Sequence, residues 1–169
     1  MSLFASEILH LAPPGSVVDI AITKHARFLD KSGELAQHYP GVQEQVYLTG
    51  YDTLVRILDT KYYPVAYTLE PLQAFFESNR IWCMFRTGDE WGGREAQRAY
   101  LEAIKRGDRE VEGCKKEWGE RIEFMDNDLG EPVSSTLVRE AAKRQDGEVL
   151  GGLLTEKVKN WVLERKLYT

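Results

Sequence analysis

The sequence is poor in cysteine and has no long apolar run. Only two cysteines, Cys83 and Cys114, occur among the 169 residues. No CxxC pair and no histidine at ligand spacing accompanies them, which argues against a disulfide framework and a structural zinc site. No run of about 18 apolar residues and no apolar segment after a basic start occurs. We therefore expect a protein of the cytoplasm, with the nucleus as a second location, and no membrane partner.

An excess of positive charge is also missing. The chain has 22 Lys and Arg residues against 27 Asp and Glu, a formal net charge of −5. This balance argues against nucleic acid as a partner and favours small anionic ligands. At 43% hydrophobic and 11% aromatic residues, the chain is too apolar to be disordered. Its length predicts one domain over residues 1–169, and no repeat or linker divides it.

Short apolar segments alternate with segments of helical periodicity. Strands are expected at residues 17–22, 46–48, 81–85 and 122–125, the third of them buried on both faces. Helices are expected around residues 4–11, 54–58, 69–76, 100–104 and 158–162, and from Ser135 onward. This alternation predicts an α/β fold with a Rossmann-like parallel sheet and helices on both faces. In such sheets, ligands bind beyond the carboxyl ends of the strands.

A hydroxyl-rich segment opens the helix that follows the last expected strand. Ser134, Ser135 and Thr136 lie at its start, and Arg139 follows one turn later. The first N–H groups of a helix lack internal partners, and side chains tilt toward the N-terminus, so these groups converge on one spot. They predict a phosphate-binding corner. The alternative is that a serine only caps the helix and that Arg139 is solvated.

Two further motifs follow strands of the expected sheet. Gly50 and Asp52 come after residues 46–48, where glycine allows close approach of a ligand and the carboxylate can accept hydrogen bonds. Arg86 ends the strand at 81–85 and can meet a phosphate at the same edge. The alternatives are that Asp52 is an ordinary helix cap and that Arg86 faces water.

A mixed cationic and aromatic segment leaves the first expected strand. Lys24 and Arg27 could hold the phosphate of a second substrate, with Phe28 stacked on its base. His25 has no visible partner for acid–base work and is not assigned a catalytic role. Residues 61–63 could line the same cleft, although aromatic pairs more often belong to the core.

The order of these motifs resembles the nucleotidyltransferase superfamily. G-x-D, an arginine ending the next strand, S-S-T-x-x-R and a closing helix that ends with residues 164–168 are most similar to nicotinamide mononucleotide adenylyltransferases. Residues 23–32 and 50–57 are most similar to the fungal and plant branch of that group. The resemblance implies an adenylyltransferase-type fold, ATP and a mononucleotide as substrates, Mg²⁺, and a role in NAD synthesis. It assigns the ATP phosphates to Ser134, Ser135, Thr136 and Arg139, nucleotide contact to Gly50 and Asp52, and the adenylate site to Arg86.

One family feature is missing. No H-x-G-H-like histidine pair occurs, so no catalytic residue is assigned, and we expect the sheet to lack the family's first strands. The exposed edge or face would then favour association with a second copy. A noncatalytic nucleotide-binding or interaction module, and a slow ATP hydrolase using the same pocket, are the alternatives to adenylyl transfer. In this family, the resemblance implies, the histidine pair lies on a phosphate-binding loop. Without that loop the rate of adenylyl transfer should be much lower, because this chemistry depends on positioning and charge neutralisation.

Overall fold

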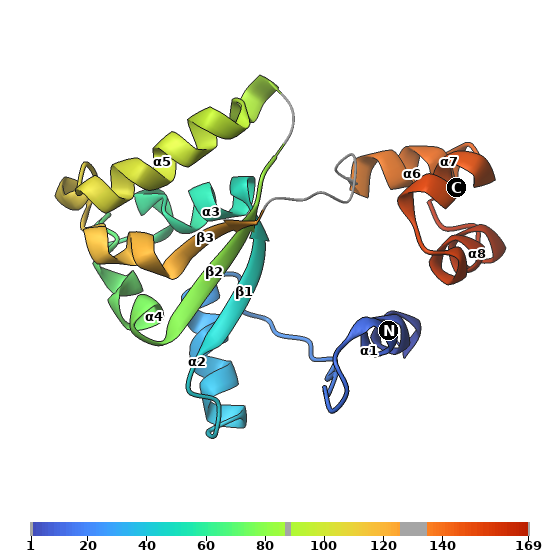
Figure 1. Cartoon of the computed structure of the whole chain (residues 1–169), viewed down its shortest axis with the longest axis horizontal. Helices are drawn as coiled ribbons and strands as arrows, with labels where there is room; N and C mark the ends of the chain where they lie inside the picture. Colours follow the sequence, from blue (N-terminus) through green and yellow to red (C-terminus); the bar gives the residue numbers. More distant parts are fainter. Residues whose placement is uncertain (1, 87–88, 126–134, 169) are drawn as a thin grey trace. The chain divides into compact units, whose positions relative to one another are not determined.

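The chain forms two compact units. The computed structural model describes residues 2–86, 89–125 and 135–168. One unit comprises Thr23–Gly130, and the other combines Met1–Ile22 with Glu131–Thr169. Figure 1 shows the helices and strands of each unit in chain order, and the units are described in turn.

The unit of residues 23–130 is built on a three-stranded parallel sheet. Strand β2 (Asn79–Met84) lies between β1 (Gln45–Gly50) and β3 (Ile122–Met125), as Figure 1 shows. The helices of this unit are α2 (Phe28–His38), α3 (Tyr51–Ile57), α4 (Gln73–Ser78) and α5 (Arg94–Arg106), with short 3-10 turns at Thr60–Tyr62, Glu70–Leu72, Asp89–Trp91, Glu110–Glu112 and Lys116–Arg121. This arrangement confirms the expected α/β fold with a parallel sheet.

The register of the strands brings their carboxyl ends to one edge. Gly50 is paired with Met84, and Met84 with Met125. Because all three strands run in the same direction, the segments that follow Gly50 and Met84 leave the sheet at the same edge. This edge is where α/β sheets bind ligands.

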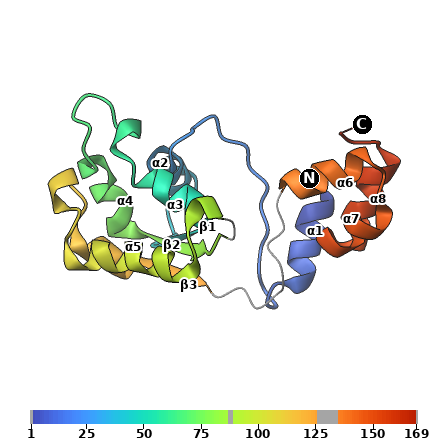
Figure 2. The same cartoon turned by 90° about the horizontal axis from the view of Figure 1, so that it is seen from above.

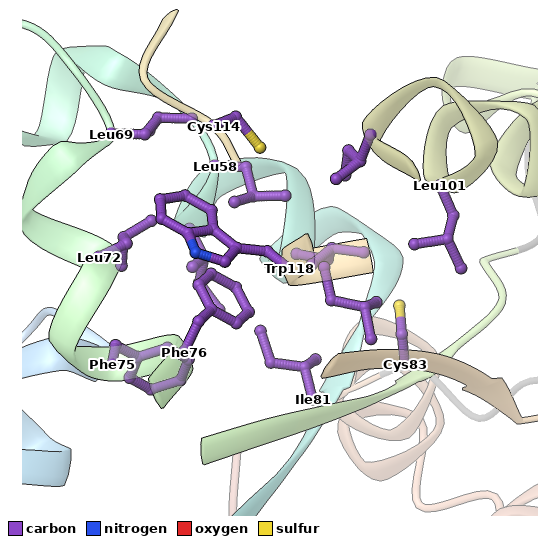
Figure 3. Close-up of a cluster of buried hydrophobic side chains, with 14 of the residues drawn as sticks. Leu58, Leu69, Leu72, Phe75, Phe76, Ile81, Cys83, Leu101, Cys114 and Trp118 are labelled. Atoms are coloured by element: carbon purple, nitrogen blue, oxygen red, sulfur yellow. The ribbon is translucent and has the colours of Figure 1, made fainter. Parts of the chain in front are cut away.

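One face of the sheet is covered and carries the core of this unit. Ile81 and Cys83 of β2 are fully buried there, together with side chains from α3, α4 and α5. Figure 3 shows the cluster, in which the rings of Phe76 and Trp118 stack with centroids 4.8 Å apart. Both cysteines, Cys83 and Cys114, are free and buried in this core, and burial raises the pKa of the Cys83 thiol to about 12.

The opposite face of the sheet carries exposed apolar side chains. Leu48 is 68% exposed, and Trp82 and Met84 are 37% and 44% exposed. The prediction that residues 81–85 are buried on both faces is therefore wrong, although the strand itself is confirmed. The apolar run arises because this strand is apolar on its uncovered side as well. We call Val46, Leu48, Trp82, Met84 and Met125 the open sheet face.

In its described residues, the second unit has four helices. Helix α1 (Ser2–Leu11) packs against α8 (Glu156–Glu164), and α7 (Gly147–Leu153) packs against both α6 (Ser135–Lys143) and α8, as can be followed in Figure 2. Their small core holds Ala141, Ala142, Leu150 and Val162. The Thr155 hydroxyl donates a 2.6 Å hydrogen bond to the Glu7 carboxylate, which ties the two ends of the chain together.

The strand expected at residues 17–22 does not form. Residues 16–26 have neither helical nor strand structure, and Val17 and Ile22 are 83% and 85% exposed. Alternating apolar residues indicate which side of a strand would be buried, but a strand also needs a hydrogen-bonding neighbour. Here the segment has no neighbouring strand among the described residues.

Two helices were not predicted from the sequence. Helix α2 is largely polar, with no buried apolar residue, so its periodicity gives a weak signal. Helix α7 contains Gly147, Gly151 and Gly152, and glycine disfavours helices. Asp146 compensates at its start, because the side chain accepts a hydrogen bond from the backbone N–H of Val149.

In the part of the chain that the structure describes, no helix has the length and apolar character needed to cross a membrane.

Candidate functional site

Gly50 occupies the tightest position at the carboxyl edge of the sheet. It ends β1 and caps α3 with an ordinary extended backbone, so its conformation does not require glycine. The space around it favours glycine instead. A Cβ atom at this position would lie 2.7 Å from Oδ1 of Asp52 and 2.8 Å from Nε of Arg86. Glycine therefore allows the carboxylate and the guanidinium to meet directly over the end of the strand.

Asp52 and Arg86 form an ion pair at this edge. Nε of Arg86 donates to Oδ1 of Asp52 at 2.5 Å, and the two side chains are 37% and 16% exposed, respectively. Burial alone raises the pKa of Asp52, but the hydrogen bond from Arg86 and the charges of Arg86 and Arg56 outweigh it and leave this pKa below its ordinary value. Asp52 is thus held as a carboxylate. It is an ion-pair partner and not the helix cap, because the N-cap of α3 is Gly50.

A cluster of aromatic side chains packs beside the ion pair of Asp52 and Arg86. Tyr51, which lies between Gly50 and Asp52 in the sequence, has a buried side chain. The centroid of its ring lies 6.2, 5.7 and 6.1 Å from those of Trp91, Tyr100 and Phe124. Phe124 also stacks on Phe85 at 4.5 Å. The elements that carry Asp52 and Arg86 are therefore packed on a shared aromatic cluster, which holds the two side chains in register.

A pocket of about 270 Å³ opens along α3, next to this edge. Six of the residues that line it carry polar groups or aromatic rings: Arg27, Phe28, Thr53, Arg56, Tyr62 and Tyr63. Tyr63 is buried, donates a 2.7 Å hydrogen bond to the carbonyl of Ile57, and has a pKa raised to about 12 by burial. Tyr62 is 42% exposed. Of residues 61–63, Tyr62 and Tyr63 thus line the pocket, Tyr63 also belongs to the core, and Lys61 does not line the pocket.

The structure brings together two of the three residues predicted for a second substrate. Arg27 and Phe28 both line the pocket. Arg27 also forms a two-pronged hydrogen bond with Asp30, at 2.8 and 3.1 Å. The Phe28 ring meets Tyr47 edge-on at 5.4 Å, and Nζ of Lys31 lies 4.8 Å from its centroid. Lys24 is exposed in the irregular segment before α2 and does not line the pocket.

The hydroxyl-rich helix start belongs to the four-helix unit. Ser135 and Thr136 open α6, and Nη2 of Arg139 donates to Oγ of Ser135 at 3.3 Å. Arg139 therefore reaches back over the first turn, as helical geometry predicts. Ser134 lies outside the described residues. The phosphate-binding role of these residues stays a prediction.

Two residues of this region were not singled out from the sequence. Arg56 follows Asp52 by one helical turn on α3, and that spacing could have identified it. Gln97 is fully buried on α5, where it hydrogen-bonds the main chain of Arg86. It precedes the buried Leu101 by four residues, and a polar residue on the apolar side of a helix is the signal that could have found it.

Metal-binding clusters are lacking in the described part of the chain. No group of three or more His, Cys, Asp or Glu side chains there could hold a metal ion. The Glu34 carboxylate of α2 lies 3.3 Å from Nε2 of His25 and 3.4 Å from Nε2 of His38. His25, in the irregular segment before α2, thus has an acidic partner in Glu34.

The chain is similar to a protein of Schizosaccharomyces pombe named "Putative nicotinamide mononucleotide adenylyltransferase". The two are 37% identical over 145 residues, which cover 85% of this chain and 57% of the relative. The chain therefore spans little more than half the length of this relative. No family model matches the chain, and no solved structure matches it.

The parallel α/β fold and this similarity define a protein of the nucleotidyltransferase superfamily. Within the superfamily, the chain belongs to the nicotinamide mononucleotide adenylyltransferase-like proteins. The family resemblance carried by the G-x-D and S-S-T-x-x-R motifs is thereby confirmed. The family, however, does not by itself assign an activity to this chain.

Proposed function

We propose that the chain transfers the adenylyl group of ATP to a pyridine mononucleotide in NAD synthesis. The observation that carries this proposal is the pair of Asp52 and Arg86 over Gly50, at the carboxyl edge of a parallel sheet. The neighbouring pocket along α3 supports a second ligand beside the first. The named relative supports the choice of reaction.

In the proposed reaction, a phosphate oxygen of the mononucleotide attacks the α-phosphorus of ATP. A new P–O bond forms, the bond from the α-phosphorus to the bridging oxygen of the β-phosphate breaks, and pyrophosphate leaves with that oxygen. Negative charge spreads over the reacting phosphate, so positioned cations lower the barrier. Arg86 would supply such a charge, and Asp52 would fix its direction while presenting a carboxylate edge to the nucleotide.

Each of the remaining residues has a proposed role. Gly50 would let the nucleotide approach the strand end closely, since it adds no side chain there. Arg27, Phe28 and Arg56 would bind the mononucleotide in the pocket along α3, with Lys24 adding positive charge nearby. Separately, we propose that the start of α6, with Ser134, Ser135, Thr136 and Arg139, binds phosphate oxygens.

Magnesium would enter with ATP as part of the substrate. The described residues form no cluster of three metal ligands, and Asp52 already accepts a hydrogen bond from Arg86. Mg²⁺ commonly binds through substrate phosphates with few protein carboxylates. The residues present therefore fit a MgATP substrate better than a resident metal.

A noncatalytic nucleotide-binding module is the second candidate. The observation that favours it is the site itself, which offers Asp52 and Arg86 for binding and, among the described residues, no assigned catalytic group. Such a module would bind ATP at the same edge without forming product. Binding and turnover must therefore be measured separately.

The test is an assay of the whole chain with MgATP and nicotinamide mononucleotide, in which pyrophosphate and dinucleotide are quantified together. The proposal predicts equal amounts of both products, and at least a tenfold loss of rate in Arg86→Gln. Arg80→Gln is the matched control, because Arg80 lies near the amino end of the same strand, in an exposed ion pair with Glu44. It should keep the full rate.

Three other outcomes would contradict adenylyl transfer. ATP binding without either product would favour the noncatalytic module. Release of free phosphate without a second substrate would indicate an ATP hydrolase. Absence of both binding and turnover would remove the proposed function altogether.

A further inference from the structure

We propose that Gln97 is a positioning residue, which fixes the main chain of Arg86 and thereby directs its guanidinium toward Asp52 and the nucleotide. This inference rests on the proposed function for its ligand. It concerns a buried side chain on α5 that the family motifs do not include.

The amide of Gln97 satisfies both backbone groups of Arg86. The backbone N–H of Arg86 donates to Oε1 of Gln97 at 3.0 Å, and Nε2 of Gln97 donates to the carbonyl of Arg86 at 2.7 Å. The side chain of Gln97 is fully buried. A neighbouring strand would satisfy a backbone N–H and carbonyl in the same way, with two hydrogen bonds. Losing these two hydrogen bonds in a buried place is costly, because the Arg86 backbone groups would be left without partners.

Arg86 needs this substitute because it lies beyond the regular sheet. The pairing of β1 with β2 ends at Gly50 and Met84, two residues before Arg86. Gln97 extends the hydrogen bonding of the β2 chain past this point. The backbone direction of Arg86 is therefore set by α5.

A third hydrogen bond connects Gln97 to the segment that leads into α5. Nε2 of Gln97 also donates to the carbonyl of Gly92 at 3.0 Å. One oxygen and two N–H donors of the amide are then all used, so the group has one orientation and is fully satisfied. Gln97 holds the end of β2 and the start of α5 at a fixed separation.

The consequence reaches the ion pair through the Arg86 side chain. Nε of Arg86 is the atom bonded to Asp52, so Nη1 and Nη2 would be the donors offered to a phosphate. A rotation of the Arg86 backbone would move all three nitrogens, because the guanidinium is planar and rigid. Loss of Gln97 should therefore weaken ATP binding without removing any group that touches ATP.

Two variants distinguish the hydrogen bonds of the Gln97 side chain from the volume that it fills. Gln97→Met keeps the length of the side chain and makes none of the three hydrogen bonds. Gln97→Glu keeps an acceptor for the Arg86 N–H but turns a carboxylate toward two carbonyl oxygens. Protonation of that carboxyl at lower pH restores one donor. Gln73→Met is the matched control, because Gln73 lies on α4, where its amide nitrogen donates to the Glu77 side chain.

The experiment follows the Arg86 Nε–H signal by NMR in the whole chain, together with titrations of MgATP and nicotinamide mononucleotide. We expect Gln97→Met to shift or broaden that signal and to weaken MgATP about tenfold, while mononucleotide affinity stays within twofold. Gln97→Glu should recover part of the signal and of the MgATP affinity between pH 7.5 and about 5.5. Gln73→Met should match the unmodified chain.

The inference is overturned if the Arg86 Nε–H signal and the MgATP affinity are unchanged in Gln97→Met. Equal losses of MgATP and mononucleotide would also overturn it, because they indicate a general loss of structure. If the unmodified chain binds no MgATP, the proposed function fails, and the Arg86 signal alone still decides whether Gln97 positions this residue. If Gln97→Met does not fold, the pH dependence of Gln97→Glu decides the question.

Discussion

Asp52 and Arg86, 34 residues apart in the chain, meet in a 2.5 Å hydrogen bond over the end of β1. Asp52 follows β1 and Arg86 follows β2, so the parallel register is what brings them together. Both lie at the edge where α/β sheets bind ligands. A nucleotide at this edge would meet a cation whose direction is already set by a carboxylate.

Gly50 should not tolerate a side chain. Gly50→Ala places a methyl group against Asp52 and Arg86, so one of the two must move. We expect a loss of about 1–3 kcal/mol in unfolding free energy or an equivalent opening of the ion pair, together with weaker ATP binding. Gly41→Ala is the control, since a Cβ there meets nothing within 4 Å. Equal unfolding midpoints and ATP affinities for the two variants would contradict the described packing.

The ion pair should make stability depend on pH. The folded-state pKa of Asp52 is lowered, so its contribution is present above the ordinary carboxyl pKa and is lost as the pH falls through the folded value. Urea unfolding of the unmodified chain, compared with Asp52→Asn at a series of pH values, measures this. The difference should be largest near neutral pH and shrink below about pH 4. A difference that grows on acidification would contradict the pairing.

The start of α6 should contribute to phosphate binding. If it does, ATP raises the melting temperature of the chain, and Arg139→Ala reduces or abolishes that shift. Arg144→Ala is a suitable control, because Arg144 is exposed just after the end of the same helix. An unchanged ATP-dependent shift in Arg139→Ala would show that the helix start is an ordinary cap.

The open sheet face should promote self-association, because it exposes apolar side chains. Leu48, at 68% exposure, is its most exposed residue. Size-exclusion chromatography with light scattering should show a concentration-dependent dimer, and Leu48→Lys should shift it toward the monomer. A chain that is monomeric at all concentrations would make the expectation of a homo-oligomer wrong.

The sequence predicted the three strands of the sheet because they are short, apolar segments between segments of helical periodicity. β3 was expected at the residues where it forms, and β1 and β2 within a few residues. Residues 17–22 show the limit of the method, since alternation cannot supply the missing neighbour. Helix α2 shows another limit, because it is largely polar, and its few apolar residues, among them Phe28 and Leu29, pack on the core without being fully buried.

Motifs at strand ends predicted that Gly50, Asp52 and Arg86 lie at one edge of the sheet, and the parallel register brings them together there. Their role in binding stays a prediction. The specific pairing of Asp52 with Arg86 was not predicted, because it depends on side-chain direction and on the space left by Gly50. Gln97 was not predicted to belong to this region, for the same reason. Its role consists of contacts with the main chain of a residue 11 positions away, which spacing alone does not reveal.

The most direct test of nucleotide binding at this edge is a titration of the whole chain with MgATP, followed by backbone amide NMR shifts. We predict saturable shifts at Gly50, Asp52 and Arg86, with little change at Leu72, which lies in the core before α4. Saturable binding that leaves the signals of these three residues unshifted would contradict it. The absence of any shift at about 10 mM MgATP, a concentration at which even millimolar affinity gives substantial binding, would also contradict it.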